Sequence, residues 1–367
     1  MIIGVDGNEA NVTQKVGVST YTDNLLHYFH QNAGPELRFK IFLKNDPCQT
    51  MPRQNRFFRY EVIKGRIFWS QFFLPLRLYL KKDIDIFFSP AHYAPRFCSV
   101  PYVVTIHDLA YLYYPDEFLK KDLYKLKKWT SYSLKNAASV IAVSQSTKKD
   151  ILKNYPVPEN KIKVIYNGYE KKLKNKIALK RLKETNGKQP FILYVGTIQP
   201  RKNIDTLIKA FADFKRENEE YKLIIAGKKG WLFESVFDLV NELGLSDSVY
   251  FTDYISDRQL AYLYQNAFCL VLPSFYEGFG IPVLEAMSFG CPVIASFSSS
   301  LPEVGGDACL YFNPKNLKDL SDKLRLLKKD GGLRSQLTKK GKLRIKLFSW
   351  KDCAEQTLNV LKSVHEN

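Results

Sequence analysis

The sequence predicts an α/β protein made of two Rossmann-like, doubly wound parallel-sheet domains that face a cleft. Short apolar runs alternate with amphipathic, helix-like stretches, which is the pattern of strand–helix–strand units. The alternation starts again after residue 190, and a charged, apolar-poor segment at residues 171–190 separates the two series. Strands that are apolar on both faces are typical of parallel sheets covered by helices, and such sheets bind ligands at the carboxyl ends of their strands. A chain of 367 residues is long enough for two sizeable cores.

The expected elements follow in order along the chain. Strands are expected in the first half at residues 2–6, 38–43, 85–89, 102–106, 139–143 and 163–166. Strands are expected in the second half at residues 191–196, 222–226, 249–252, 269–272, 292–295 and 309–312. Amphipathic helices fit between them, for example at residues 203–217 and 257–265, and the tail after Trp350 has a helical pattern. The predicted organisation is therefore a first domain at residues 1–170, a linker at 171–190 and a second domain at 191–349.

The net charge of +18 is concentrated in the first half and the linker. Residues 1–170 carry 24 basic and 15 acidic side chains, and residues 171–190 carry eight basic and one acidic. A basic surface suggests nucleic acid or an anionic membrane as a partner, whereas a lysine-rich composition with a solvated linker explains the same numbers. No nucleic-acid-binding motif accompanies the charge, so no nucleic-acid partner is expected.

The class of protein is narrowed further by what the sequence lacks. No apolar stretch is long enough to span a membrane, and residues 1–6 resemble a short strand rather than a signal peptide. The six cysteines are scattered without metal-binding or C-x-x-C spacing, which is typical of reduced core residues. We expect a cytoplasmic protein, with peripheral association at the inner face of the cell membrane as the further expectation.

Residues 53–82 interleave cations with aromatic side chains, a composition that suits a membrane interface. A core helix over residues 69–80, before the strand at 85–89, explains the pattern equally well. Within the next residues, Asp83 and Asp85 have a D-x-D spacing used elsewhere for manganese, but they stand at the start of the expected strand rather than at its catalytic end. We therefore interpret them as a polar strand boundary and expect no metal.

The most informative stretch is Pro273-Ser-Phe-Tyr-Glu-Gly-Phe-Gly-Ile-Pro-Val-Leu-Glu-Ala-Met287. It follows a buried strand, passes through two glycines and opens a helix with Pro282 in its first turn. A helix start offers free N–H groups and a positive dipole end, and Gly278 and Gly280 let a ligand approach the backbone closely. Glu277 precedes this anion site and Glu285 lies inside the helix. An ordinary strand–loop–helix turn is the alternative interpretation.

Two further motifs end strands of the predicted sheets. After the strand that ends at Gly196, the adjacent cations Arg201 and Lys202 precede a helix, with Asn203 as the expected N-cap. Together these cations can neutralise a diphosphate, although a solvated basic loop would look the same. In the first domain an apolar strand delivers His107 at its carboxyl end, and a lone histidine there is often only structural.

The segment EGFGIPVLEAMSFGCPVIAS, with Glu277 and Glu285 separated by seven residues, resembles the signature of the retaining, nucleotide-sugar-dependent glycosyltransferases of family 4, which have the GT-B fold. The resemblance extends along the chain through Gly17, His107, the Arg201-Lys202 pair and the segment Ser299-Ser-Leu-Pro-Glu-Val304. That last segment is similar to bacterial mannosyltransferases of cell-surface polysaccharide synthesis, including lipopolysaccharide biosynthesis. In GT-B relatives the last helix crosses back to the first domain, so residues 350–367 are expected to pack there.

The resemblance implies a role for each matching residue. Arg201 and Lys202 would hold the donor diphosphate and stabilise the leaving group, in place of a divalent cation. Glu277 would contact donor-sugar hydroxyls, Glu285 the ribose hydroxyls, and His107 the donor sugar. The set implied to contact the donor also includes loop glycines and backbone amides, together with strand-end residues near the nucleobase: Gly17, Gly196, Lys228, Tyr254, Ile255, Gly278, Phe279, Gly280 and Ile281. Gly17 stands alone, because Val16 replaces the glycine that usually adjoins it.

The implied reaction moves a hexose from a nucleoside diphosphate sugar to a hydroxyl of a glycan or polyprenyl-linked acceptor, with retention at the anomeric carbon. Mannose from GDP-mannose is the first expectation, and no cofactor is expected besides this co-substrate. Three alternatives stay open: a transferase that uses a UDP- or ADP-sugar, a sugar-nucleotide epimerase, and a non-catalytic membrane- or RNA-binding protein on the same scaffold. An acceptor linked to a lipid would agree with the basic first domain.

Overall fold

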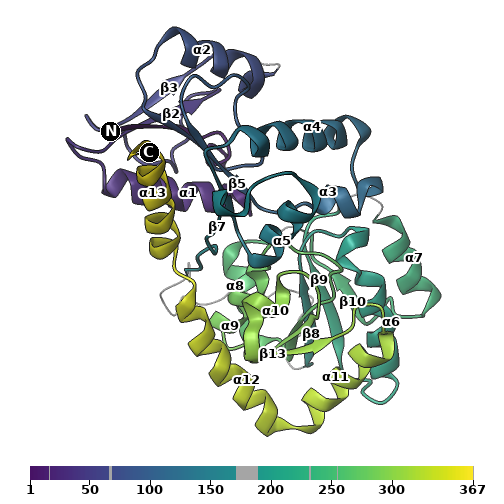
Figure 1. Cartoon of the computed structure of the whole chain (residues 1–367). Helices are drawn as coiled ribbons and strands as arrows, with labels where there is room; N and C mark the ends of the chain where they lie inside the picture. Colours follow the sequence, from purple (N-terminus) through teal and green to yellow (C-terminus); the bar gives the residue numbers. More distant parts are fainter. Residues whose placement is uncertain (16, 66–67, 171–188, 231–232, 254, 367) are drawn as a thin grey trace. The chain divides into compact units, whose positions relative to one another are not determined.

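A computed structural model describes residues 1–15, 17–65, 68–170, 189–230, 233–253 and 255–366 (Figure 1). The chain forms two compact units, one of residues 1–168 and 348–367 and the other of residues 169–347. Each unit is built on one parallel sheet, with seven strands in the first and six in the second. The predicted fold class, with two doubly wound parallel α/β sheets, is confirmed. Most of the predicted linker, at 171–188, lies outside the described residues.

The strands of the first unit lie in the order β3-β2-β1-β4-β5-β6-β7. Their bounds are β1 Ile2–Asp6, β2 Arg38–Leu43, β3 Phe58–Val62, β4 Ile86–Ser89, β5 Tyr102–Ile106, β6 Ser139–Ala142 and β7 Ile162–Val164. The six expected strands are present, with ends shifted by up to two residues. The strand β3 was not predicted; it is an edge strand and only half-buried, so its cation–aromatic pattern lacks the apolar run of a central strand.

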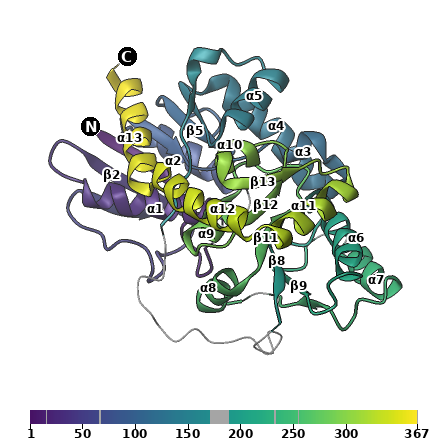
Figure 2. The same ribbon diagram turned by 90° about the horizontal axis from the view of Figure 1, so that it is seen from below.

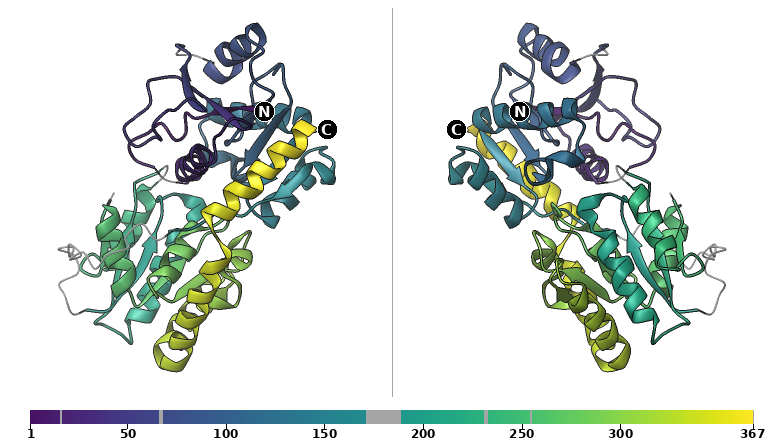
Figure 3. Two further views of the ribbon diagram at one scale, coloured as in Figure 1. Left: turned by 90° about the vertical axis from the view of Figure 1, so that its left-hand side faces the viewer. Right: turned by 90° about the vertical axis from the view of Figure 1, so that its right-hand side faces the viewer.

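Helices cover both faces of this sheet. The helices of the unit are α1 Val18–Gln31, α2 Leu74–Leu80, α3 Ala110–Tyr113, α4 Lys120–Asn136, α5 Gln145–Asn154 and α13 Trp350–Glu366. Successive strand residues alternate between two core clusters: Ile86 and Phe88 of β4 belong to one and Phe87 to the other. The C-terminal helix α13 packs beside α1 and contributes Leu358 and Leu361 to the first cluster (Figures 1 and 3).

The six strands of the second unit lie in the order β10-β9-β8-β11-β12-β13, part of which can be followed in Figure 2. They are β8 Phe191–Val195, β9 Lys222–Ala226, β10 Val249–Phe251, β11 Cys269–Leu272, β12 Val293–Ser296 and β13 Cys309–Phe312. Its helices are α6 Ile204–Lys215, α7 Glu234–Glu242, α8 Asp257–Asn266, α9 Ile281–Ser288, α10 Leu301–Gly305, α11 Leu317–Lys329 and α12 Gly331–Arg344. All six strands expected in this half are present.

Both sheets share the strand order of a Rossmann fold, 3-2-1-4-5-6 when each is counted from its own first strand, and the first unit adds a seventh. In such a sheet the order reverses between the first and fourth strands, and ligands bind outside the carboxyl ends of those two strands. The reversal lies between β1 and β4 in the first unit and between β8 and β11 in the second. These two positions are where functional sites are expected.

The segment at residues 69–80 contributes one of its faces to the core, as the core-helix interpretation predicts. It forms a π-helical turn, η1 (Trp69–Phe73), followed by α2. One face is core, since Trp69, Leu74 and Leu78 are buried. The opposite face leaves Phe72, Leu76, Tyr79 and Leu80 exposed. Of the residues that the structure covers, none belongs to a helix with both the length and the apolar character needed to cross a membrane.

The two aspartates of the D-x-D motif, Asp83 and Asp85, both have partners for their side chains within the first unit. Arg77 donates to Asp83 at 2.8 Å and to Glu61, and Lys40 lies 2.5 Å from Asp83. The backbone N–H of Ile2 donates to Asp85 at 2.6 Å, next to the start of β4. Both carboxylates therefore have partners that fix the amino-terminal edge of the sheet.

Candidate active site

The predicted cation pair and the predicted glutamate meet at the strand reversal of the second unit. Arg201 and Lys202 follow β8 in a short 3₁₀ turn, η4 (Pro200–Lys202), and Glu277 follows β11. Because β8 and β11 are neighbouring parallel strands, their carboxyl ends lie at one edge of the sheet. Residues 75 positions apart in the sequence are thereby brought into contact.

Lys202 and Glu277 form a close, largely buried ion pair. The Nζ of Lys202 donates to Oε1 of Glu277 at 2.6 Å, and their side chains are 14% and 13% exposed. The hydroxyl of Ser274 donates to the same carboxylate oxygen at 2.7 Å. Burial by itself would raise the pKa of Glu277, but the charges of Lys202 and Arg201 and these hydrogen bonds outweigh it, so the pKa lies below its ordinary value. The glutamate is a carboxylate at neutral pH.

The backbone of Glu277 is held as firmly as its side chain. Its N–H donates to Oγ of Ser299 at 2.8 Å, and the Ser300 hydroxyl donates to its carbonyl at 2.9 Å. Arg201 donates to the carbonyl of Tyr276 at 3.2 Å, so the cation loop and the glutamate loop are joined directly. We did not predict these serine contacts. The serines at 298–300 stand more than 20 residues from Glu277, and only their position beside it in the fold shows their role.

The glycine-rich loop places the start of α9 beside this ion pair. Gly280 precedes the helix with φ +99°, a conformation that favours glycine, and Pro282 occupies the first turn as predicted. A Cβ at Gly280 would also lie 2.6 Å from Cδ2 of Leu301. The helix start, with Gly278, Phe279 and Ile281, presents N–H groups and a positive dipole end next to two cations.

Glu285 lies in α9 and is oriented by a tyrosine that was not predicted. The hydroxyl of Tyr264, from α8, donates to Oε2 of Glu285 at 2.8 Å. The Tyr264 ring is buried and stacks on Phe289 at 5.9 Å between ring centroids. No pattern in the sequence joins residues 264 and 285, because the contact depends on the packing of two helices.

Asn203 occupies the N-cap position of the next helix, as the sequence predicts. Asn203 precedes α6 in the left-handed conformation, with φ +57°, and its side chain makes no capping hydrogen bond. Its amide instead donates to the carbonyls of Pro273 and Pro314 at 3.0 and 2.9 Å. The buried side chain therefore ties the cation loop to the segments after β11 and β13, because its donors satisfy carbonyls that burial would otherwise leave unpaired.

Of the remaining predicted donor residues, Gly196, Lys228 and Ile255 also lie near this edge of the second sheet. Gly196 follows β8, and Lys228 is an exposed residue just after β9. Ile255 is half-buried just before α8. Tyr254 lies outside the described residues.

The first unit has a cavity at its own strand reversal, with a volume of about 380 Å³. Its lining includes Asp6 at the end of β1, Ser89 at the end of β4, and the side chains of Glu9, Lys44, His92 and Trp129. We call it the switch-point cavity. Burial raises the pKa of Asp6 despite hydrogen bonds from Asn8 and the nearby charge of Lys44. The predicted residue Gly17, with φ +51°, precedes α1 in this unit.

His107 is buried after β5, and its hydrogen bond identifies the ring's tautomer. Nε2 lies 2.7 Å from the carbonyl of Pro90. A carbonyl only accepts, so Nε2 carries the proton and Nδ1 of the neutral ring is an acceptor. Burial and the neighbouring His92 lower the pKa of His107 to about 4, against smaller opposing effects of Pro90 and Asp108. The ring is neutral at pH 7.

The lowered pKa of His107 predicts acid sensitivity of the first unit. In the unfolded chain the His107 ring takes up a proton near pH 6.5, whereas in the folded protein it does so only near pH 4. The free energy of unfolding therefore decreases as pH falls through this window. Between pH 7 and 4 we expect the free energy of unfolding to fall by up to roughly 3 kcal/mol more in the wild-type protein than in His107→Gln. Denaturant unfolding followed by tryptophan fluorescence measures it, since Trp69, Trp129 and Trp350 belong to this unit. His365→Gln, at an exposed position, is the control and keeps the wild-type slope.

The fold and the site together define a class of protein. Two sheets of the Rossmann type, and a helix start flanked by two cations and two glutamates, are suited to holding a phosphorylated, hydroxyl-rich ligand. The class is identified by the similarity of this chain to known protein families and to individual proteins. The family described as Glycosyltransferase Family 4 matches residues 16–172, and Glycosyl transferases group 1 matches residues 175–344.

The chain belongs to the family 4 glycosyltransferases, which have the GT-B fold. It is 33% identical over 282 residues to O-antigen chain mannosyltransferase B of Escherichia coli, covering 76% of this chain and 74% of the relative. It is 37% identical over 215 residues to O-antigen chain mannosyltransferase RfbU of Salmonella typhimurium, covering 59% and 57%. Sucrose-phosphate synthase from Thermosynechococcus elongatus has the same fold, with a TM-score of 0.77 at 20% identity over 99% of this chain and 98% of that one.

Proposed function

We propose that the protein is a retaining mannosyltransferase that moves mannose from GDP-mannose to a hydroxyl of a glycan or lipid-linked acceptor in cell-surface polysaccharide synthesis. The observation that carries the proposal is the Lys202–Glu277 ion pair, joined to Arg201 beside the start of α9. This pair brings together, at one strand reversal, two cations that are suited to a diphosphate and a carboxylate that is suited to sugar hydroxyls. The choice of mannose is supported by the two O-antigen mannosyltransferases among the relatives.

In the proposed reaction the bond between the anomeric carbon and the diphosphate oxygen breaks, and a bond to the acceptor oxygen forms on the same face. The acceptor proton passes to the leaving phosphate. Arg201 and Lys202 stabilise the negative charge that develops on the leaving group, which is an electrostatic role for preorganised cations. Glu285, oriented by Tyr264, accepts from the ribose hydroxyls. His107 is neutral, and its Nδ1 is suited to accept from a hydroxyl of the donor sugar.

We further propose that the acceptor binds in the switch-point cavity of the first unit. Its carboxylates, Asp6 and Glu9, accept hydrogen bonds from sugar hydroxyls, and Trp129 offers an apolar ring face. The position outside the carboxyl ends of β1 and β4 is the usual ligand position in a sheet of this order.

Thermal-shift titration with GDP, UDP and ADP tests the donor site. We expect GDP to raise the unfolding temperature of the wild-type protein most, because a ligand bound only by the folded state stabilises it by mass action. A larger shift with UDP or ADP would replace GDP-mannose as the donor. No shift with any nucleotide would contradict the donor site altogether.

Product analysis then separates transfer from epimerisation. Incubation with GDP-mannose and an acceptor should release GDP and yield a glycoside with the donor's anomeric configuration, with or without EDTA. A product that still carries the nucleotide would favour the sugar-nucleotide epimerase instead.

A further inference from the structure

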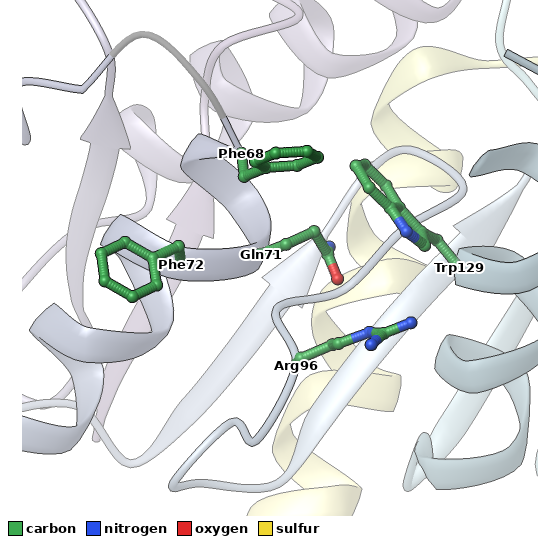
Figure 4. A pocket seen from close by; sticks show the side chains of 5 residues that line it. All are labelled: Phe68, Gln71, Phe72, Arg96 and Trp129. Carbon is green, nitrogen blue, oxygen red and sulfur yellow. The ribbon is translucent and has the colours of Figure 1, made fainter. Parts of the chain in front are cut away.

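Five residues other than glycine have a left-handed backbone within the described part of the chain: Phe68, Phe97, Asn203, Asp253 and Ser299. This conformation is uncommon for a residue with a side chain, and it persists only where the surroundings hold it. Phe68 lines a second cavity of the first unit, of about 350 Å³, which shares Trp129 with the switch-point cavity (Figure 4). Ser299 lies in the second unit, where its side chain contacts Glu277 directly.

Ser299 lies opposite Glu277 because of the strand order of the second sheet. It follows β12 and Glu277 follows β11, and these neighbouring strands run parallel, so both loops leave the same edge of the sheet. The Oγ of Ser299 accepts from the backbone N–H of Glu277 at 2.8 Å, and the φ of Ser299 is +44°. The strained serine is thus bonded to the glutamate that pairs with Lys202.

Glycine would adopt the backbone conformation of residue 299 more easily than serine does, because it has no Cβ to crowd the carbonyl in the left-handed region. What serine adds at this position is a hydroxyl, and that hydroxyl is bonded to Glu277. Backbone strain of this kind is frequent at functional sites. The contact with Glu277 therefore accounts for a serine at a position that would favour glycine.

Four other serines join the same two loops. Ser300 donates to the Glu277 carbonyl at 2.9 Å, and Ser274 donates to Oε1 of Glu277 at 2.7 Å. The hydroxyls of Ser296 and Ser298 both donate to the carbonyl of Ser274, at 2.5 and 2.8 Å. The N–H, the carbonyl and Oε1 of Glu277 are therefore all held by serine hydroxyls.

The proposed function assigns different residues to the different parts of the donor. Arg201 and Lys202 hold the diphosphate, Glu285 the ribose, and Glu277 the hydroxyls of the sugar. The hydroxyl of Ser299 is bonded to the backbone of Glu277. Its removal would release the residue that contacts the sugar and leave the nucleotide's residues in place.

We propose that Ser299 is a positioning residue for the donor sugar: its hydroxyl fixes the backbone of Glu277 so that the carboxylate meets the sugar hydroxyls, while the nucleotide binds without it. The inference rests on the proposed function and deepens it, because it separates recognition of the sugar from recognition of the nucleotide. A misplacement of about 1 Å can cost on the order of 10²-fold in rate, so one lost hydrogen bond has a measurable effect.

Ser299→Gly tests the inference in the full-length protein, with GDP-mannose as donor and the methyl glycosides of mannose, galactose and N-acetylglucosamine as acceptor probes. The variant loses the Oγ acceptor but relieves the backbone strain, so its unfolding temperature should equal or exceed that of wild type. The thermal shift caused by GDP should stay unchanged, whereas kcat/KM for GDP-mannose should fall about tenfold or more. A wild-type kcat/KM, or a GDP shift that falls with it, would overturn the inference.

Two further variants separate positioning from folding. Ser299→Asn keeps a side-chain oxygen that can accept, and asparagine tolerates the left-handed region, so it should transfer within about threefold of wild type. Ser335→Gly, at an exposed position of α12, should lower the unfolding temperature without changing kcat/KM, because glycine disfavours a helix interior. An asparagine variant as slow as Ser299→Gly, or equal loss of transfer in Ser335→Gly, would contradict the assigned role.

Hydrogen exchange of the ligand-free protein needs neither donor nor acceptor, so its result is independent of the proposed function. The Glu277 amide should exchange about tenfold faster or more in Ser299→Gly than in wild type, because its acceptor is gone, while the amides of β9 should be unchanged. Equal exchange at Glu277 in the two proteins would also overturn the inference. Failure of the proposed function would instead appear as a wild-type protein that no nucleotide stabilises.

Discussion

Replacing Lys202 with alanine is expected to lower kcat/KM for glycosyl transfer by roughly 10²–10³-fold while the protein stays folded. The change removes a cation aimed at the charge that develops on the leaving diphosphate, and losses of this size follow when one preorganised donor is removed. Glu277 also loses its 2.6 Å partner, although the bond from Ser274 and the nearby Arg201 remain to hold it. Steady-state kinetics with saturating acceptor measure the effect, and circular dichroism measures the fold.

The control for Lys202→Ala is Lys209→Ala, which removes an exposed lysine from α6. It should keep wild-type kinetics, because its charge is solvated and lies away from the ion pair. Glu277→Ala should match Lys202→Ala in lost transfer. If either site variant transfers at the wild-type rate, the roles assigned to the pair are wrong.

Replacing Gly227 with alanine is expected to destabilise the second unit by roughly 2–4 kcal/mol. Gly227 has φ +156°, and a Cβ there would lie 2.0 Å from the carbonyl oxygen of Gly196. The obstacle is backbone rather than a flexible side chain, so the ends of β8 and β9 would have to separate. Because Arg201 and Lys202 follow β8, affinity for GDP should fall as well. Denaturant unfolding followed by circular dichroism gives the stability, and thermal shift gives the affinity.

Gly244→Ala isolates the contribution of backbone conformation in this experiment. Gly244 also has a positive φ, +65°, but a Cβ there meets no atom within 4 Å. Gly244→Ala should lower the free energy of unfolding by only about 1 kcal/mol and leave the affinity for GDP unchanged. Equal destabilisation by the two substitutions would show that the close approach of Gly227 to Gly196 is unimportant.

The expected strands were found from the sequence because a buried strand is a local pattern. Runs such as those at 102–106 and 269–272 are apolar throughout, as strands covered on both faces must be. The edge strand β3 and the side-chain partners of Asn203 were missed for the opposite reason. A half-buried edge strand has no such run, and the partners of Asn203, Pro273 and Pro314, stand 70 and 111 residues away.

The residues of the candidate site can likewise be separated into those that local sequence patterns predicted and those that they did not. Arg201, Lys202, Glu277 and Glu285 were predicted because a strand end, glycines and a helix start are local signals. Ser274, Ser299 and Ser300 around Glu277, and Tyr264 on Glu285, were not, because hydroxyls are common in loops and carry no spacing signal.

The sequence by itself determined the two series of strands and helices, the place of the glycine-rich loop before a helix, and the residue types available for a diphosphate and a sugar. Only the tertiary structure decided that β8 lies next to β11 and β1 next to β4, and therefore that Lys202 meets Glu277 and that Trp129 borders two cavities. The physical reason is that the periodicity of burial is set by neighbours along the chain. Hydrogen-bond and ion-pair partners are set by the order in which distant strands join a sheet.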